Sequence, residues 1–143
     1  MENKYGLRLG ARIGRGGFAE IYRAESAQGV PCAVKVSLDP LDGENAAVRK
    51  ELDNLNLVKT VTDHSNIVSL MDWWLVAGYL VTRWELATDG SLLDLLHQHR
   101  DAGLEGIPLE ELFRYLRDAA RGIDFLNCEK CIDHRAIKPA NLP

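Results

Sequence analysis

A glycine-rich turn near the N-terminus limits what this chain can fold into more than any other feature. Gly14, Gly16 and Gly17 lie in the segment GRGGFAEI. Apolar and polar side chains alternate over residues 7–13, before the turn, which is the period of a β-strand. The residues after the glycines, up to residue 24, also have strand character. The sequence therefore predicts a strand, a glycine turn and a second strand.

Three structures are compatible with such a turn. Closely spaced glycines let backbone N–H groups approach a phosphate without interference from a Cβ atom. A dinucleotide-binding turn would need a helix directly after the glycines and a parallel sheet. Residues 23–38 instead bring a turn and a strand too soon for a crossover helix of normal length. A plain glycine hairpin that binds nothing is the remaining alternative.

The elements that follow predict an α+β fold. Further strands are expected at residues 32–38, 67–75 and 78–84. A helix with apolar residues at helical spacing is expected between the first two of these strands, at residues 44–59. Strands joined by hairpins form an antiparallel sheet, so the chain is α+β rather than α/β.

Two more helices are expected in the C-terminal part of the chain. Ser91 precedes an apolar run and has Asp94 at the spacing of a capping box, which indicates a helix start. Pro108, followed by two acidic residues, indicates the start of a longer helix. Seven residues form the expected apolar face of that helix: Leu112, Phe113, Leu116, Ala119, Ala120, Ile123 and Leu126.

Lys35 lies between two valines of the third expected strand. A lysine on a buried strand needs a counter-charge or a ligand. Glu51 is our choice of partner, because it faces the apolar stripe of the helix expected at residues 44–59. Glu44 is the alternative, although the helix dipole alone explains an acidic residue at a helix start. A solvated lysine on an edge strand is the other interpretation of Lys35.

The segment IDHRAIKPANLP, residues 132–143, resembles the catalytic loop of protein kinases, in which His-Arg-Asp is followed at fixed spacing by Lys and Asn. Here His134 and Arg135 are followed by Ala136, Lys138 and Asn141. The glycine turn, Ala-Val-Lys, the helix with Glu51 and this loop occur in the order of that family. The resemblance covers residues 7–142 and is closest to the Ser/Thr type, with a bacterial style of loop.

The resemblance implies a domain organisation and a set of site residues. Residues 1–84 would be the N-lobe, a five-stranded antiparallel sheet with one helix. Residues 85–90 would be a hinge, and residues 91–143 a partial C-lobe that ends in the catalytic loop. The implied ATP-binding residues are Gly14, Gly16, Gly17, Ile21, Ala33, Lys35, Glu51, Thr82, Trp84 and Leu86. Lys138 would have a catalytic role, and Asn141 would bind Mg²⁺.

Within the implied roles, Ile21 and Ala33 would pack on the adenine, and Thr82 would be the gatekeeper at the back of the pocket. Backbone groups from Trp84 to Leu86 would hydrogen-bond the purine edge. The segment between Thr82 and Ser91 is longer than usual for the family, so the hinge assignment can shift by two residues.

Ala136 stands where the family has its catalytic aspartate. An alanine can neither orient the substrate hydroxyl nor accept its proton, which are functions worth about 10²–10⁴-fold in rate. The 143 residues also contain no Asp-Phe-Gly, the motif whose aspartate holds Mg²⁺. We therefore expect an inactive chain with weak or absent ATP and Mg²⁺ binding. A piece of a longer kinase, an engineered inactivation and a natural degenerate kinase all remain open.

The alternative function is a pseudokinase-like module that binds a nucleotide or acts as a scaffold through a protein partner. A small α+β binding domain with an accidental glycine turn is a third possibility. In the parent family, the partners would be ATP and a protein substrate.

Composition excludes several other classes. The chain is 46% hydrophobic and 27% charged, as expected for a globular domain with a core. Its net charge of −4 disfavours nucleic-acid binding. No apolar run approaches the roughly 20 residues that cross a bilayer, and the N-terminus does not resemble a signal peptide. We therefore expect a cytoplasmic protein without membrane contact.

The three cysteines, Cys32, Cys128 and Cys131, are expected to be reduced thiols. The pair Cys128 and Cys131, followed by His134, lacks the further ligand that zinc requires. It also follows a helix rather than preceding one, which is the wrong end for lowering a thiol pKa. Two small, partly buried residues are the simpler interpretation.

Overall fold

The computed structural model describes residues 5–41, 46–61, 64–132 and 137–142. These residues form two compact units. The first contains the described residues of 1–63 together with 68–86, and the second contains residues 64–67 together with the described residues of 87–143.

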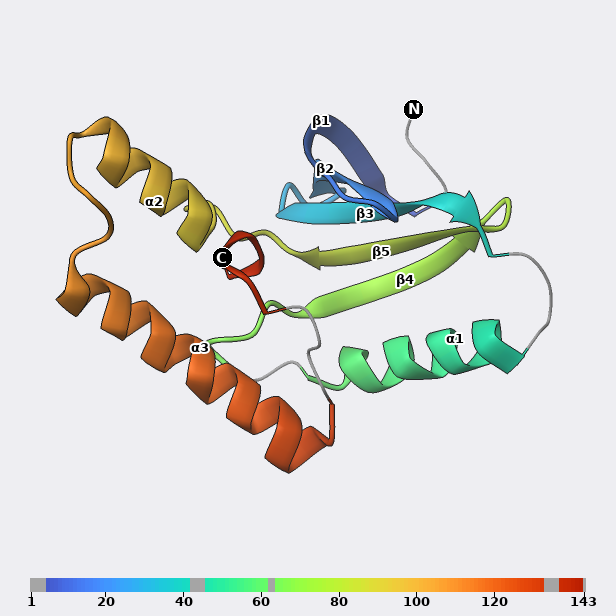
Figure 1. Cartoon of the computed structure of the whole chain (residues 1–143). Coiled ribbons are helices and arrows are strands. Elements are labelled where there is room, and N and C mark those ends of the chain that lie inside the picture. Colours follow the sequence, from blue (N-terminus) through green and yellow to red (C-terminus); the bar gives the residue numbers. More distant parts are fainter. Residues whose placement is uncertain (1–4, 42–45, 62–63, 133–136, 143) are drawn as a thin grey trace. The chain divides into compact units, whose positions relative to one another are not determined.

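The first unit is a five-stranded antiparallel sheet with one helix (Figure 1). The strand order is β1-β2-β3-β5-β4. The elements are β1 (Leu7–Arg15), β2 (Ala19–Ser26), β3 (Pro31–Pro40), α1 (Ala46–Lys59), β4 (Leu70–Val76) and β5 (Tyr79–Glu85). The α+β prediction is confirmed, and a dinucleotide-binding turn is excluded because an antiparallel strand, rather than a helix, follows the glycines.

One face of the sheet carries the core. The buried members are Leu7, Ala24, Cys32 and Val34, and Tyr5, Val36, Trp74 and Val81 pack partly buried against them. The rings of Tyr5 and Trp74 lie with their centroids 5.0 Å apart. Residues that alternate with these core positions face the opposite side of the sheet, because successive side chains of a strand point to opposite faces.

One turn and one proline mark the ends of three strands. Ala77 and Gly78 have φ angles of 51° and 86°, as the two-residue hairpin turn between β4 and β5 requires. Strand β3 runs to Pro40, two residues beyond the end predicted at residue 38. Pro40 pairs with Tyr79 after a register shift. A proline is compatible with this irregular end of the ladder, because no regular backbone hydrogen bond is required there.

Helix α1 is attached to β4 by two polar contacts. The indole Nε1 of Trp73 donates to Asn56 Oδ1 at 3.1 Å, and Lys59 Nζ lies 2.8 Å from Asp72 Oδ1. The hydrogen bond from Lys59 is the largest cause of a lowered Asp72 pKa. The expected helix start, at Glu44, lies outside the described residues.

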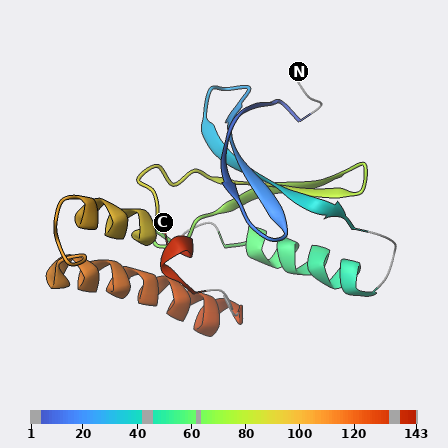
Figure 2. The ribbon, with the colours of Figure 1, turned by 45° about the horizontal axis from the view of Figure 1, so that its top comes forward.

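The second unit contains α2 (Leu92–Asp101), α3 (Leu109–Lys130) and a short 3₁₀ turn, η1 (Pro139–Asn141) (Figure 2). The predicted capping box is present, because the Ser91 hydroxyl accepts from the Asp94 amide and the Asp94 carboxylate accepts from the Ser91 amide. His99 Nε2 of α2 lies 3.1 Å from Glu111 Oε2 of α3. The amide of Leu92 donates to the carbonyl of Leu142, which ties the 3₁₀ turn to the start of α2.

Helix α3 packs against residues 64–67 near its middle. Gly122 is buried there, and the rings of His64 and Phe125 lie 4.7 Å apart. Two members of the predicted apolar face, Phe113 and Leu116, are exposed by 61% and 42%. The N-terminal part of the predicted apolar face is therefore open to solvent in this unit.

Candidate functional site

The sheet face opposite the core brings together most of the predicted nucleotide-binding residues. Ile21 of β2 pairs with Lys35 of β3, which pairs with Thr82 of β5. In the next row, Ala33 of β3 pairs with Trp84 of β5. Directly paired residues share a sheet face, so these five side chains lie on one surface that spans three strands.

The glycine turn lies at one end of this surface. Gly14 pairs with Ile21, and the amide of Gly16 donates to the carbonyl of Ala19 at 2.8 Å. Phe18, at the tip, is 89% exposed, and its carbonyl accepts from the amide of Leu38 on β3. The turn is thus an open loop that is connected to the central strand.

Packing does not explain the glycines at the tip of the turn. A Cβ atom on Gly17 would meet no other atom within 4 Å, and one on Gly16 would meet only a carbonyl oxygen at 3.8 Å. Neither residue has a positive φ angle. The fold would therefore accept a side chain at both positions, and close approach of a ligand to the backbone is the physical reason left for glycine.

Charge on this face favours an anion. Lys35 is exposed, and so is Arg23, which pairs with Ala33. Within the described part of the chain, no carboxylate is recorded as an ionic partner of either side chain. Two cations on one open face attract phosphate groups.

Glu51 is on the right helix but does not contact Lys35. Trp73 shares a face with Thr82, and its bond to Asn56 places α1 on that same side of the sheet. The Glu51 side chain is exposed and lines a shallow hollow along α1. Among the described residues, neither an ion pair nor a hydrogen bond joins it to Lys35. The structure therefore contains the sheet and the helix of the expected pair, with both charges facing solvent.

Thr82 and Trp84 are joined by a hydrogen bond. The indole Nε1 of Trp84 donates to Thr82 Oγ1 at 2.8 Å, and Thr82 Oγ1 lies 3.5 Å from the carbonyl oxygen of Lys35. Thr82 is 4% exposed. The amide of Glu85 donates to the Ser69 carbonyl, and Leu86 follows β5, half-buried.

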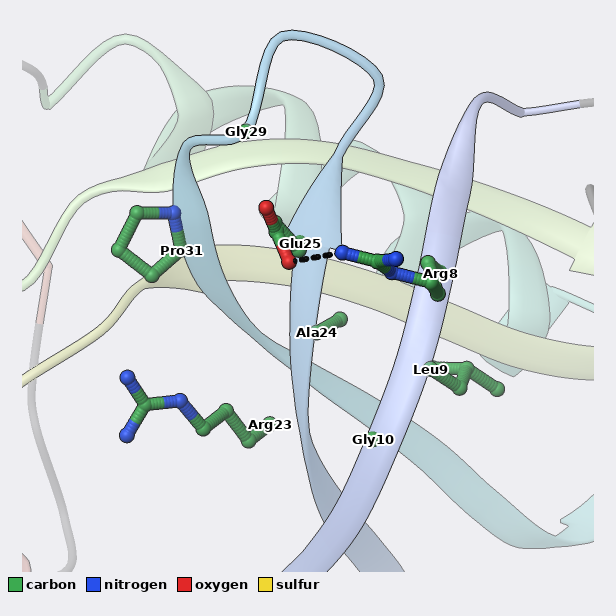
Figure 3. A pocket seen from close by; sticks show the side chains of 8 residues that line it. All are labelled: Arg8, Leu9, Gly10, Arg23, Ala24, Glu25, Gly29 and Pro31. Atoms are coloured by element: carbon green, nitrogen blue, oxygen red, sulfur yellow. Dashed lines mark hydrogen bonds and ion pairs between the residues drawn. The ribbon is translucent and has the colours of Figure 1, made fainter.

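A hollow of about 560 Å³ continues this face beyond the row of Ala33 and Trp84 (Figure 3). Its lining residues are Arg8, Leu9, Gly10, Arg23, Ala24, Glu25, Gly29 and Pro31. Arg8 is paired with Glu25, whereas the side chain of Arg23 extends away from that ion pair. Since Glu25 pairs with Pro31 in the next row, the hollow lies on the same surface, farther from Lys35.

The predicted catalytic-loop residues belong to the second unit. Lys138 and Asn141 are exposed, and the Asn141 amide donates to the Lys138 carbonyl at 2.8 Å. Ala136 lies outside the described residues. Over the described ranges, no group of three or more His, Cys, Asp or Glu side chains could hold a metal ion.

Sequence reasoning missed two features of this surface. It assigned only backbone groups of Trp84 to the site and did not predict the bond from its indole to Thr82. It also did not single out Arg23, although its position two residues after Ile21 on a strand places it on the same face. Period-two alternation could have found Arg23, whereas a side-chain hydrogen bond has no sequence signal.

The fold and this surface together define a class of protein. A glycine turn between β1 and β2, a helix between β3 and β4 and an antiparallel sheet form the N-lobe of a protein kinase, and α2 and α3 match the start of the C-lobe. The family profile "Protein tyrosine and serine/threonine kinase" matches residues 7–142. The chain therefore belongs to the protein kinase family.

Individual relatives agree with the family assignment. A protein described as a probable protein kinase from Dictyostelium discoideum is 33% identical over 134 residues, which is 92% of this chain and 38% of that protein. A probable LRR receptor-like serine/threonine-protein kinase from Arabidopsis thaliana is 31% identical over 92% of this chain and 14% of its own length. Fibroblast growth factor receptor homolog 1 from Drosophila melanogaster is 26% identical over 95% of this chain and 20% of its length.

The chain thus spans well under half the length of these relatives. In the part of the chain that the structure describes, no helix is long and apolar enough to cross a membrane.

Proposed function

We propose that this chain binds ATP on the sheet face that carries Ile21, Ala33, Lys35, Thr82 and Trp84. The single observation that carries the proposal is the pairing of these five residues on one face, at the end of which the glycine turn lies. The expected parent activity is transfer of the γ-phosphoryl group of ATP to Ser or Thr of a protein.

Each part of the surface has a defined role in this proposal. The open backbone around Gly16 and Gly17 lets amides approach the phosphates, and the ammonium of Lys35 binds the α- and β-phosphates. The side chains of Ile21 and Ala33 pack on the base. Backbone groups between Trp84 and Leu86 bind the purine edge, in the segment 85–90 that we assign as the hinge.

The catalytic ion pair needs a movement of α1. Glu51 is exposed on that helix, and pairing with Lys35 would require the helix to bring its carboxylate over the sheet. Such positioning of the helix controls activity in protein kinases. We propose that formation of this ion pair depends on such a movement of α1.

The described residues give less support for Mg²⁺ binding than for ATP binding. Asn141 offers one oxygen ligand, but the described residues contain no cluster of carboxylates around it. Protein kinases hold the metal with an aspartate and an asparagine together. We therefore derive no metal-dependent step for this chain and expect its nucleotide affinity to depend little on Mg²⁺.

We also propose that these 143 residues do not transfer phosphate. Ala136 replaces the residue that would orient the substrate hydroxyl and take its proton. The sequence contains no Asp-Phe-Gly to hold the metal. The alternative function is a nucleotide-binding or scaffold module with a protein partner. Such a module would use the same surface but would not transfer a phosphoryl group.

Binding of ATP by the purified chain, measured by isothermal titration calorimetry with and without Mg²⁺, tests the proposal. Lys35→Ala should weaken binding at least tenfold, because it removes the cation nearest the phosphates. Lys59→Ala is the matched control, since that lysine of α1 pairs with Asp72 of β4, and it should bind like the wild type. Equal affinities for the wild type and Lys35→Ala would refute the proposed site.

Phosphotransfer is tested separately, with γ-labelled ATP and a general Ser/Thr protein substrate. We expect no transfer by the wild type, and none after Ala136→Asp, because the metal-holding aspartate is still missing. Label incorporation by Ala136→Asp would contradict the proposed cause of inactivity.

A further inference from the structure

The Trp84 indole lies along β5, on the same sheet face as the proposed nucleotide site. Its Nε1 donates to the hydroxyl of Thr82, two residues earlier on the same face of the strand. A side chain can form this bond only by turning along the strand toward Thr82, instead of projecting away from the sheet. The ring is therefore half-buried and covers the strip of β5 between the two residues.

This strip borders the residues that would pack on a purine. Trp84 pairs with Ala33, and Thr82 pairs with Lys35, so the indole runs beside the segment of β3 from Ala33 to Lys35. A base that packs on Ala33 and reaches the backbone of β5 needs the same space. An indole and a purine are both flat aromatic systems with an N–H donor, so they compete for one surface.

We propose that Trp84 is an internal gate of the nucleotide site, and that a purine enters only when the indole leaves Thr82. The inference rests on the proposed nucleotide function and specifies it further. Ligands that need only the glycine turn and Lys35, such as inorganic tripolyphosphate, do not meet the gate. Adenine nucleotides do, and their affinity is lowered by the bond between Trp84 and Thr82.

Three substitutions separate the parts of the gate. Trp84→Leu removes both the ring and the donor. Trp84→Phe keeps a flat ring but removes the N–H group. Thr82→Val keeps the shape of the partner and removes the acceptor. Trp74→Phe is the matched control, because Trp74 lies on the opposite, core face of the sheet, against Tyr5.

The affinity of each variant for ATP and for tripolyphosphate is measured by calorimetry. One net hydrogen bond corresponds to about a three- to tenfold change in affinity. We therefore expect Trp84→Leu to bind ATP about three- to tenfold more tightly than the wild type, and Thr82→Val to bind it more tightly as well. Tripolyphosphate affinity should be the same in all four variants and the wild type.

Indole N–H resonances of the ¹⁵N-labelled protein provide a second, structural readout. The chain has three tryptophans, so Trp→Phe variants assign the three signals. Thr82→Val should shift the Trp84 signal, and ATP should shift it in the same direction while leaving the Trp74 signal in place. Tripolyphosphate should move neither signal.

Different results would overturn different claims. If ATP binding depends on Lys35 but is unchanged by Trp84→Leu, or if ATP leaves the Trp84 signal in place, the gate is refuted and the nucleotide site stands. If no variant binds ATP or tripolyphosphate, both the gate and the proposed function are wrong. Weaker ATP binding by Trp84→Leu would show that the indole is part of the purine surface and not a competitor of the purine.

Discussion

Substitution of Gly122 by alanine sets two known effects against each other in α3. Alanine in place of glycine within a helix normally stabilises by about 1 kcal/mol, because glycine loses more backbone entropy on folding. At this position the added Cβ would lie 2.8 Å from the carbonyl oxygen of Asn66 and 3.4 Å from Cγ1 of Ile67. The first distance is shorter than any ordinary carbon–oxygen contact, and the oxygen belongs to the backbone.

The strain cannot be relieved by rotating a side chain. Either α3 or residues 64–67 must shift, and the tilted contact between the rings of His64 and Phe125 joins these same two segments. Overpacking of this kind costs about 1–3 kcal/mol. Subtracting the gain of about 1 kcal/mol in helix propensity leaves a net loss of about 1 kcal/mol, so Gly122→Ala should destabilise the second unit.

Urea unfolding followed by circular dichroism at 222 nm measures the effect. Asn127→Ala is the matched control, because Asn127 is exposed on the same helix and gains propensity without a clash. We expect a lower midpoint for Gly122→Ala and a slightly higher one for Asn127→Ala. If Gly122→Ala raises the midpoint as the control does, α3 does not pack against residues 64–67 as closely as the structure indicates.

Three further predictions test other contacts. Ser91→Ala should lower the stability of the second unit by about 1 kcal/mol, the usual worth of an N-cap, whereas Ser91→Asp should retain most of it in the same urea assay; equal losses would exclude capping by the side chain. Lys59→Met should make the stability of the first unit depend less on pH in the acidic range. In the folded chain the pKa of Asp72 is lowered, chiefly by Lys59. The Asp72 carboxylate therefore stabilises the fold above its unfolded pKa near 4, and this stabilisation is lost as the pH falls through the lower folded pKa. Unfolding midpoints at pH 7 and pH 3 measure this, and an unchanged difference between them would contradict the pairing. A thiol reagent should label Cys128 and Cys131 in the native protein and Cys32 only in denaturant, because Cys32 is buried and the other two are exposed. Labelling of all three in the native protein would show that the core face of the sheet is open.

The order of the elements could be predicted from sequence because local chemistry determines it. The hairpin turn at Ala77 and Gly78 and the capping box at Ser91 depend on residues that are adjacent or three apart, and both are present. Boundaries that depend on pairing were less accurate. Strand β3 continues to Pro40 because Tyr79, distant in sequence, pairs with it.

The candidate site was predictable as a set of residues and not as a set of contacts. Alternation along strands places Ile21, Ala33, Lys35 and Thr82 on one face once the strands pair in register, and the structure has that register. The partner of Lys35 depends instead on how far a helix stands from a sheet, which no residue pattern encodes. Glu51 therefore lies on the expected helix, while its carboxylate faces solvent.

The position of α1 decides whether Glu51 can reach Lys35. Its two polar contacts to β4, through Asn56 and Lys59, lie in the C-terminal half of the helix. Glu51 precedes both contacts along the helix, and the proposed pairing with Lys35 would require the N-terminal half of α1 to move toward the sheet. A bound triphosphate would add negative charge beside Lys35 and compete with Glu51 for the ammonium, unless the lysine binds both at once as it does in active kinases. Contact between Glu51 and Lys35 in the presence of a nucleotide would therefore show that α1 can still move to form the ion pair. No contact in the presence of a nucleotide would show that this movement has been lost.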